Sequence, residues 1–204
     1  HGASVFMSVK GVEREVSRVC IKGPEGWRVP TSLHERDDGS LIAADYDELV
    51  DSPVEIGPHR TIVWEQEEVD HRYAIWGAGE LDEQRLISDT RRIIETCSAM
   101  FGGLPYDRYL FILHVFPEGR GGLEHRCSCS LHVPPSWLAG EDYEKLIALV
   151  AHEFFHVWLG KRIRPAPLGP FDYVAENYTR NLWVVEGFTT YYTELILVRA
   201  GLIS

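Results

Sequence analysis

Two histidines and a glutamate in the segment His152-Glu153-Phe154-Phe155-His156 have the types and the spacing of a metal site. Each residue of a helix turns about 100°, so residues four apart share a face and the two imidazoles can bind one metal ion. The carboxylate of Glu153 lies one step round the helix, where it can reach water on that metal without ligating it. The pattern therefore predicts a zinc site that carries its own general base.

The neighbours of this motif indicate that its helix is buried. From Leu146 to Leu159, every residue except His152, Glu153 and His156 is apolar. A helix that is apolar all round is a buried helix, and leaving two imidazoles and a carboxylate inside it without partners would be costly. A metal ion with its water would satisfy all three groups. The alternative is a pair of hydrogen-bonded core histidines beside a buried carboxylate.

A catalytic zinc ion needs a third protein ligand and an open fourth position. Glu186 is the predicted third ligand, because it is the only acid ahead of Glu194 on the next predicted helix and its neighbours are apolar. We therefore expect a buried carboxylate that needs a partner. The competing acids are Asp172 and Glu176, in the connection before that helix, and Glu194 near its end.

Two predicted helices, Tyr143 to Leu159 and Leu182 to Arg199, must position these ligands, with a proline-rich connection over residues 160–181 between them. Apolar spacing and turn residues predict further elements upstream. They are a strand over Tyr73 to Trp76, a helix over Leu81 to Phe101, a strand over Tyr109 to Phe116 and an edge strand over Glu124 to Val133. The glycine-rich residues 117–122 predict a loop.

Residues 1–63 predict short β-strands, for example at Val5 to Met7 and Leu41 to Ala43, separated by turn residues. We expect residues 1–63 to be the C-terminal part of an upstream β domain. Residues 64–204 are then a catalytic domain that is truncated at its C-terminal side. The start at His1 and the stop at Ser204 indicate a piece of a longer protein.

The composition excludes several classes of function. The 204 residues carry a formal net charge of −11, whereas a nucleic-acid partner would need a basic face. The longest apolar runs are too short to span a bilayer, so no transmembrane segment is predicted. The four cysteines are scattered and do not resemble a disulfide scaffold, which favours a reducing, cytoplasmic compartment. The oligomeric state is not indicated by the sequence.

The two zinc segments together resemble the gluzincins, which are zinc peptidases with two histidines and a glutamate as ligands. The interval of 30 residues from His156 to Glu186 is longer than in aminopeptidase N relatives and similar to that of the glycyl aminopeptidase family. Segments like those of that family are HEFFHVW, KRIRP, FDY, ENYTR and LWVVEGFTTYY, at residues 152–158, 161–165, 171–173, 176–180 and 182–192. Residues 45–57 and 121–126 also resemble it. The resemblance implies an α+β, thermolysin-like zincin domain, in which a mixed sheet packs on two zinc-binding helices.

The segment Gly121-Gly122-Leu123-Glu124-His125 resembles the G-x-M-E-N element of aminopeptidase N relatives, in which the glutamate binds the free α-amine of the substrate. A carboxylate can hold an ammonium by a charge-assisted hydrogen bond, and glycines let the backbone approach the substrate closely. The strand that follows is expected to pair with an extended peptide. The alternative is a solvated glutamate after a glycine loop.

The predicted function is a zinc-dependent aminopeptidase that acts on peptides with a free amino terminus. It would remove the first residue, which the family name indicates to be glycine or alanine, using a metal-activated water and Glu153 as general base. The alternatives are a zinc endopeptidase with the same site and a non-catalytic, metal-stabilised peptide-binding module. A role for Glu124 argues against the first alternative, and the presence of Glu153 against the second. The oxyanion donor is expected beyond Ser204, with Tyr178 as a candidate within the chain.

Overall fold

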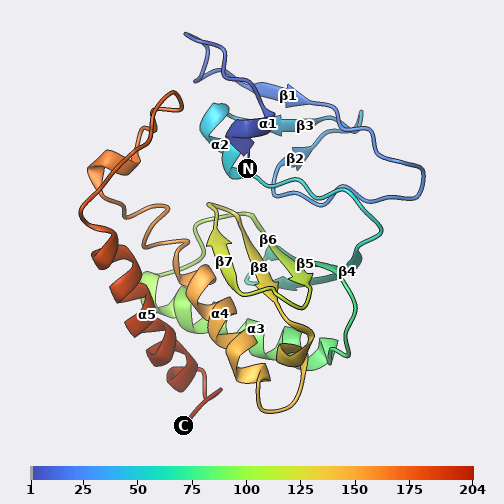
Figure 1. Cartoon of the computed structure of the whole chain (residues 1–204), viewed down its shortest axis with the longest axis vertical. Helices are drawn as coiled ribbons and strands as arrows, with labels where there is room; N and C mark the ends of the chain where they lie inside the picture. Colours follow the sequence, from blue (N-terminus) through green and yellow to red (C-terminus); the bar gives the residue numbers. More distant parts are fainter. Residues whose placement is uncertain (1) are drawn as a thin grey trace.

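A mixed sheet is the central element of residues 2–204, the part of the chain that this computed structural model describes (Figure 1). Its five strands follow the order β4-β5-β6-β8-β7. They span Arg60–Gln66 (β4), Val69–Trp76 (β5), Arg108–Val115 (β6), Gly121–Glu124 (β7) and Ser128–Val133 (β8). The inner strands β5, β6 and β8 run parallel, and β4 and β7 pair with them antiparallel at the two edges.

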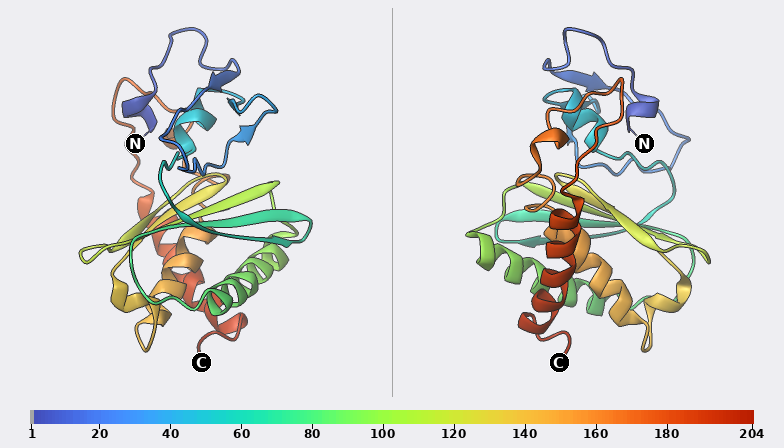
Figure 2. Two further views of the ribbon diagram at one scale, coloured as in Figure 1. Left: turned by 90° about the vertical axis from the view of Figure 1, so that its right-hand side faces the viewer. Right: turned by 60° about the vertical axis from the view of Figure 1, so that its left-hand side comes forward.

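Three helices cover one face of this sheet, and the N-terminal part of the chain lies against the other (Figure 2). The helices are α3 (Glu83–Phe101), α4 (Tyr143–Phe155) and α5 (Leu182–Arg199), with a short 3-10 helix, η1 (Pro135–Leu138), before α4. Alternate side chains of β6, including Phe111, point into the helical core, where Phe154 of α4 meets them with its ring 5.9 Å from that of Phe111. Replacing a buried phenylalanine such as Phe154 by alanine typically costs about 3–5 kcal/mol, so this contact holds α4 firmly on the sheet.

The N-terminal unit, residues 2–59, contains a small sheet of order β1-β3-β2 and two short helices. Its elements are α1 (Gly2–Val5), β1 (Ser17–Val19), β2 (His34–Glu35), β3 (Leu41–Ala43) and α2 (Tyr46–Asp51). The expectation of β-strands throughout residues 1–63 is therefore wrong for the two helical segments. Helix α2 forms because the Asp45 side chain caps it by accepting from the Glu48 backbone amide at 2.8 Å, while Tyr46 and Leu49 are buried.

Strand β4 crosses residue 63, the expected domain boundary, because all of its residues from Arg60 onward pair with β5. The connection over residues 160–181, which contains the 3-10 helix η2 (Ala166–Leu168), extends from α4 to the N-terminal unit and returns to α5 (Figure 2). It is held there by Tyr173, whose hydroxyl donates to the Asp47 carboxylate and whose ring lies edge-on to Tyr46 at 4.8 Å. Among the described residues, no helix combines the length and apolarity that crossing a membrane requires.

The edge next to the zinc motif also differs from the prediction. Residues 124–133 do not form one edge strand, because the chain turns after Glu124 and the His125 amide donates to the Ser128 carbonyl at 2.9 Å. Gly121 and Gly122, expected in a loop, pair with His132 and Leu131 as part of β7. The edge strand is thus β7 itself, and β8 lies inside the sheet.

Candidate active site

Three potential metal ligands converge where α5 packs along α4. The Nε2 atoms of His152 and His156 are 3.3 Å apart, and Oε2 of Glu186 lies 3.4 Å from the first and 3.6 Å from the second. A zinc ion with tetrahedral bonds of about 2.0–2.1 Å places its ligand atoms about 3.3 Å from one another. The three atoms therefore fit one zinc ion without any rearrangement of the backbone.

Helix α4 ends at Phe155, earlier than the predicted Leu159, yet the two histidines still share a face. His156 is the C-terminal cap and keeps a right-handed helical backbone, with φ −61° and ψ −15°. Its Nδ1 donates to the Leu159 carbonyl at 2.8 Å, which leaves the Nε2 lone pair free to bind a metal. The turn that brings this carbonyl back needs Gly160, whose φ is +123°.

The exposure of the ligands differs from the prediction. The side chain of His156 is 2% exposed, whereas that of Glu186, expected to be buried, is 50% exposed. The reason is that the outer side of the first turns of α5 faces solvent, since Trp183 and Phe188 beside Glu186 are also exposed. The ligand group is thus buried at His156 and open to solvent at Glu186, and a substrate can approach from the Glu186 side.

Electrostatics set this group apart from an ordinary core. Burial, together with the nearby carboxylates of Glu124 and Glu186, raises the pKa of Glu153 to about 8. Burial and the adjacent His156 imidazole lower the pKa of His152, so its ring stays neutral, which is the form that ligates a metal. A cation at the three ligand atoms would relieve the repulsion between the carboxylates.

Strand β7 brings Glu124 to the same place. Carboxylate oxygens of Glu124 and Glu153 and a ring nitrogen of His156 lie within 4.8 Å of one another. Gly122 makes this approach possible, because a Cβ at that position would be 2.4 Å from the carboxylate of Glu153. Gly121 has a φ of +117°, a backbone conformation that favours glycine. The glycine pair thus lets the edge strand pass directly over Glu153.

Comparisons with known proteins agree with this arrangement. The family model for M61 glycyl aminopeptidases matches residues 145–204, and the model for the peptidase M61 N-terminal domain matches residues 1–58. The chain belongs to the M61 glycyl aminopeptidase family. A search of curated proteins gave no match to it.

Solved structures resemble this M61 chain over nearly its whole length. An aminopeptidase N family protein from Idiomarina loihiensis superposes with a TM-score of 0.91 at 28% sequence identity. The match covers 97% of this chain and 36% of the Idiomarina protein. A mutant of a two-domain M1 zinc metallopeptidase bound to L-arginine has a TM-score of 0.58 at 19% identity, covering 91% and 40%. An M1 zinc metallopeptidase from Deinococcus radiodurans has a TM-score of 0.55 at 19% identity, and the match covers 91% of this chain and 41% of that protein. The M61 chain thus spans well under half the length of these proteins, and the last two share its fold.

The competing acids of the M61 chain lie away from the two imidazoles. Asp172 accepts from the Val174 amide at 2.9 Å, and Glu176 accepts from the hydroxyl of Tyr178, both within the exposed connection. Glu194 is exposed near the end of α5. Within residues 2–204, Glu186 is the carboxylate that completes a possible metal group with both histidines. Tyr178, the candidate oxyanion donor, is itself exposed and hydrogen-bonded to Glu176.

One residue that the sequence analysis missed is Asp51, at the end of α2. Its carboxylate accepts from Lys161 Nζ at 2.6 Å and from the Arg126 amide at 2.7 Å, and it lies 3.4 Å from Nδ1 of His125. Burial alone would raise the pKa of Asp51, but its contacts with His125 and Lys161 bring the pKa below its usual value. Asp51 thereby ties the turn after Glu124, and the turn after α4, to the N-terminal unit.

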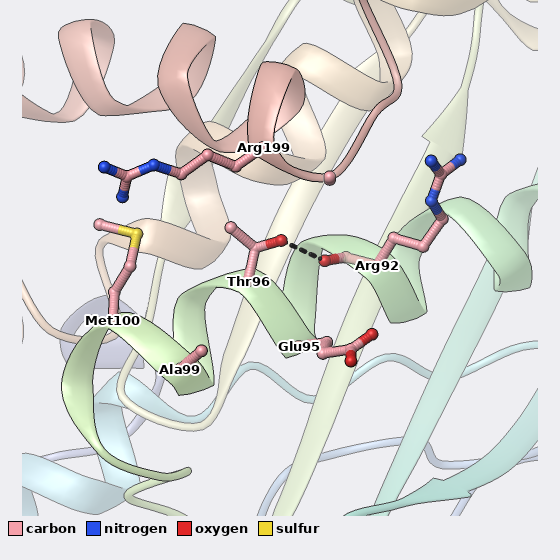
Figure 3. A pocket seen from close by; sticks show the side chains of 7 residues that line it. Arg92, Glu95, Thr96, Ala99, Met100 and Arg199 are labelled. Carbon is pink, nitrogen blue, oxygen red and sulfur yellow. Dashed lines mark hydrogen bonds between the residues drawn. The ribbon is translucent and has the colours of Figure 1, made fainter.

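A hollow of 600 Å³ lies elsewhere, between α3 and the last turn of α5 (Figure 3). It is lined by Arg92, Glu95, Thr96, Ala99, Met100, Arg199 and Ala200. Arg199 follows Glu186 by thirteen residues on one helix, which corresponds to about 20 Å along the axis. This hollow is therefore separate from the ligand group.

Proposed function

We propose that this chain carries the active site of a zinc-dependent aminopeptidase, with His152, His156 and Glu186 as zinc ligands. The observation that carries the proposal is the convergence of two Nε2 atoms and one carboxylate oxygen, 3.3–3.6 Å apart, beside a buried glutamate. Family membership supports the peptidase assignment. We further propose that the region from β4 onward is a thermolysin-like zincin domain, and that the residues before it belong to an upstream domain.

Glu153 is the proposed general base. A zinc ion bound at the three ligands would supply a Lewis acid that acidifies water and polarises a scissile carbonyl. Glu153 is 5% exposed, and a carboxylate oxygen of it lies within 4.8 Å of a ring nitrogen of His156. A cation bound at the ligand group would favour the ionised form of this carboxyl. It can therefore accept the proton of the attacking water and pass it to the leaving amine.

Glu124 is the proposed anchor for the amino terminus of the substrate. Its carboxylate projects from the edge strand on the side of Glu153 and His156, so an ammonium bound to it lies beside the scissile bond of the first residue. The outer edge of β7 offers backbone groups to an extended peptide, in place of the role expected for the following strand. Together the anchor and the strand would restrict cleavage to the first residue, with glycine or alanine as the expected preference.

The decisive experiment compares free and amino-acetylated peptides. A charge-assisted hydrogen bond contributes roughly 1.5–3 kcal/mol, so acetylation should lower kcat/KM by about one to two orders of magnitude. Glu124→Ala should lose most of this preference and keep its zinc. Profiling of aminoacyl substrates then tests the preference for glycine or alanine.

A second variant tests the chemistry itself. Glu153→Gln keeps the size of the side chain and should keep the metal, and its turnover should fall by at least about 10²-fold. Equal cleavage of free and acetylated peptides, or cuts within long peptides, would favour an endopeptidase. These assays use the protein extended past Ser204, so that the expected oxyanion donor is present. Zinc binding without any cleavage by that wild type would favour a peptide-binding module.

A further inference from the structure

A second group of metal-type ligands lies on the other face of the sheet. Along β6, Tyr109, Phe111 and Leu113 belong to the core that packs on the helices. His114 has the opposite parity and shares a face with Leu110 and Ile112, which form a separate apolar cluster. His114 therefore points away from Glu153 and toward the segment that leads out of the N-terminal unit.

Glu55 of that segment contacts both His114 and His59. Oε2 of Glu55 is 2.9 Å from Nε2 of His114 and 3.1 Å from Nε2 of His59. All three ligand atoms lie within 4.8 Å of one another. The side chain of His59 is 1% exposed, whereas those of Glu55 and His114 are each 23% exposed. The group is thus built into the protein on one side and open to solvent on the other.

The chemistry of this group matches that of a transition-metal site. Two imidazole nitrogens and a carboxylate oxygen are ligands that zinc and its neighbours in the periodic table prefer, whereas magnesium and calcium prefer oxygen alone. The ligands come from two segments that are 55 residues apart at their nearest, His59 and His114, so the fold and not local periodicity brings them together. The partial exposure of Glu55 and His114 leaves room for water in the remaining coordination positions.

Of the two ring nitrogens of His59, Nε2 is the one that has a polar partner. Within the described part of the chain, its Nδ1 is buried and has no hydrogen-bond partner. The backbone of Gly57 packs against the ring, since a Cβ there would lie 3.0 Å from Cε1 of His59. Two kinds of partner can satisfy the three ligand atoms. One is a proton on each Nε2, shared with Glu55, and the other is a single cation.

We propose that Glu55, His59 and His114 form a second divalent metal site of the zinc class, with a structural role. A cation there would join the segment that leads from the N-terminal unit into β4 directly to β6 in the middle of the sheet. A metal bound only by the folded arrangement stabilises the folded state. This site shares no residue with the active site proposed above, so the two can be tested separately.

The test uses the full chain with the first site disabled. After treatment with a chelator and dialysis, His152→Ala should still bind about one equivalent of Zn²⁺, measured by titration and metal analysis, and its Tm should rise with zinc. Adding His114→Ala should lower the zinc affinity of this variant by at least about 10-fold and abolish the rise in Tm. Glu55→Gln keeps the size and hydrogen bonding of the side chain and should also lose zinc binding. An unchanged Tm of the metal-free variant then shows that the loss does not come from unfolding. His34→Ala is the matched control, because His34 pairs with Asp107 at an exposed position.

Each outcome of this test either supports or overturns the second metal site. A His152→Ala chain that binds no zinc, or one whose zinc remains after His114→Ala, would overturn the second site. A wild-type chain that binds a single zinc, lost with His114→Ala and kept with His152→Ala, would support the second site and overturn the zinc ligands of the proposed function. Co²⁺ provides a further readout, since a built site of nitrogen and oxygen ligands should give a visible absorption band that His114→Ala removes.

Discussion

Replacing Gly122 with alanine places one methyl group where the edge strand β7 passes over α4. A Cβ at this position would lie 2.4 Å from Cδ and Oε1 of Glu153. Ordinary contact between heavy atoms begins at about 3.5 Å, so the carboxylate must move by about 1 Å. A displacement of that size in a catalytic group can lower the rate by about 10²-fold, equivalent to about 2.7 kcal/mol of transition-state stabilisation. We therefore expect kcat/KM of Gly122→Ala to fall by about that factor.

The assay measures kcat/KM for a peptide with a free amino terminus, together with zinc content and Tm. Gly122 has a backbone conformation that alanine can adopt, so the fold and the zinc should be retained. Gly187→Ala is the control, because a Cβ there meets no atom within 4 Å apart from its chain neighbours and the backbone of its own helix. A Gly122→Ala variant with wild-type activity would refute the reasoning. Loss of zinc or a large fall in Tm would show that the methyl group acts on the fold instead of on Glu153.

Three further predictions concern separate parts of the chain. Burial lowers the pKa of His71 to about 4 from an ordinary value of 6.5, so its contribution to stability is complete above pH 6.5 and is lost as the pH falls toward 4. This loss should amount to about 3 kcal/mol in denaturant unfolding, and a His71→Phe variant that kept the same pH dependence would contradict it. Asp51→Asn should lower the free energy of unfolding by about 2 kcal/mol. A double-mutant cycle with Lys161→Met checks that value, and strict additivity would exclude a coupling between the two side chains. Glu186→Ala should sharply reduce zinc content in metal analysis, and unchanged zinc affinity would contradict the assignment of Glu186 as the third ligand.

The local part of the site was predictable from the sequence. The spacing of His152 and His156 places both rings on one face of any right-handed helical backbone, and this holds even though α4 ends at Phe155. The helix over residues 81–101 was equally predictable, since Gly102 ends it in a left-handed conformation. These features depend on residues within a few helical turns of one another, so the apolar periodicity and the helix-ending glycine predict them.

The sequence also contains a local signal for the short helix α2. Asp45 and the apolar residues Tyr46 and Leu49 have the pattern of a capped, half-buried helical turn, which the structure has as α2. The short apolar runs around this segment favoured strands instead. The error arose because a segment of this length satisfies either periodicity, and packing against the N-terminal unit decides between them.

Only the tertiary structure decided the features that depend on long-range pairing. The glycines Gly121 and Gly122 become a strand because β8 pairs with them, and β7 is the edge because β8 lies beside β6. The exposure of Glu186 depends on which side of α5 the rest of the chain covers. The meeting of Glu55 with His114 requires the N-terminal unit to lie on the open face of the sheet. The sequence alone determined which groups are available for chemistry, whereas the fold decided which of them meet, because contacts between distant segments leave no periodic pattern in the chain.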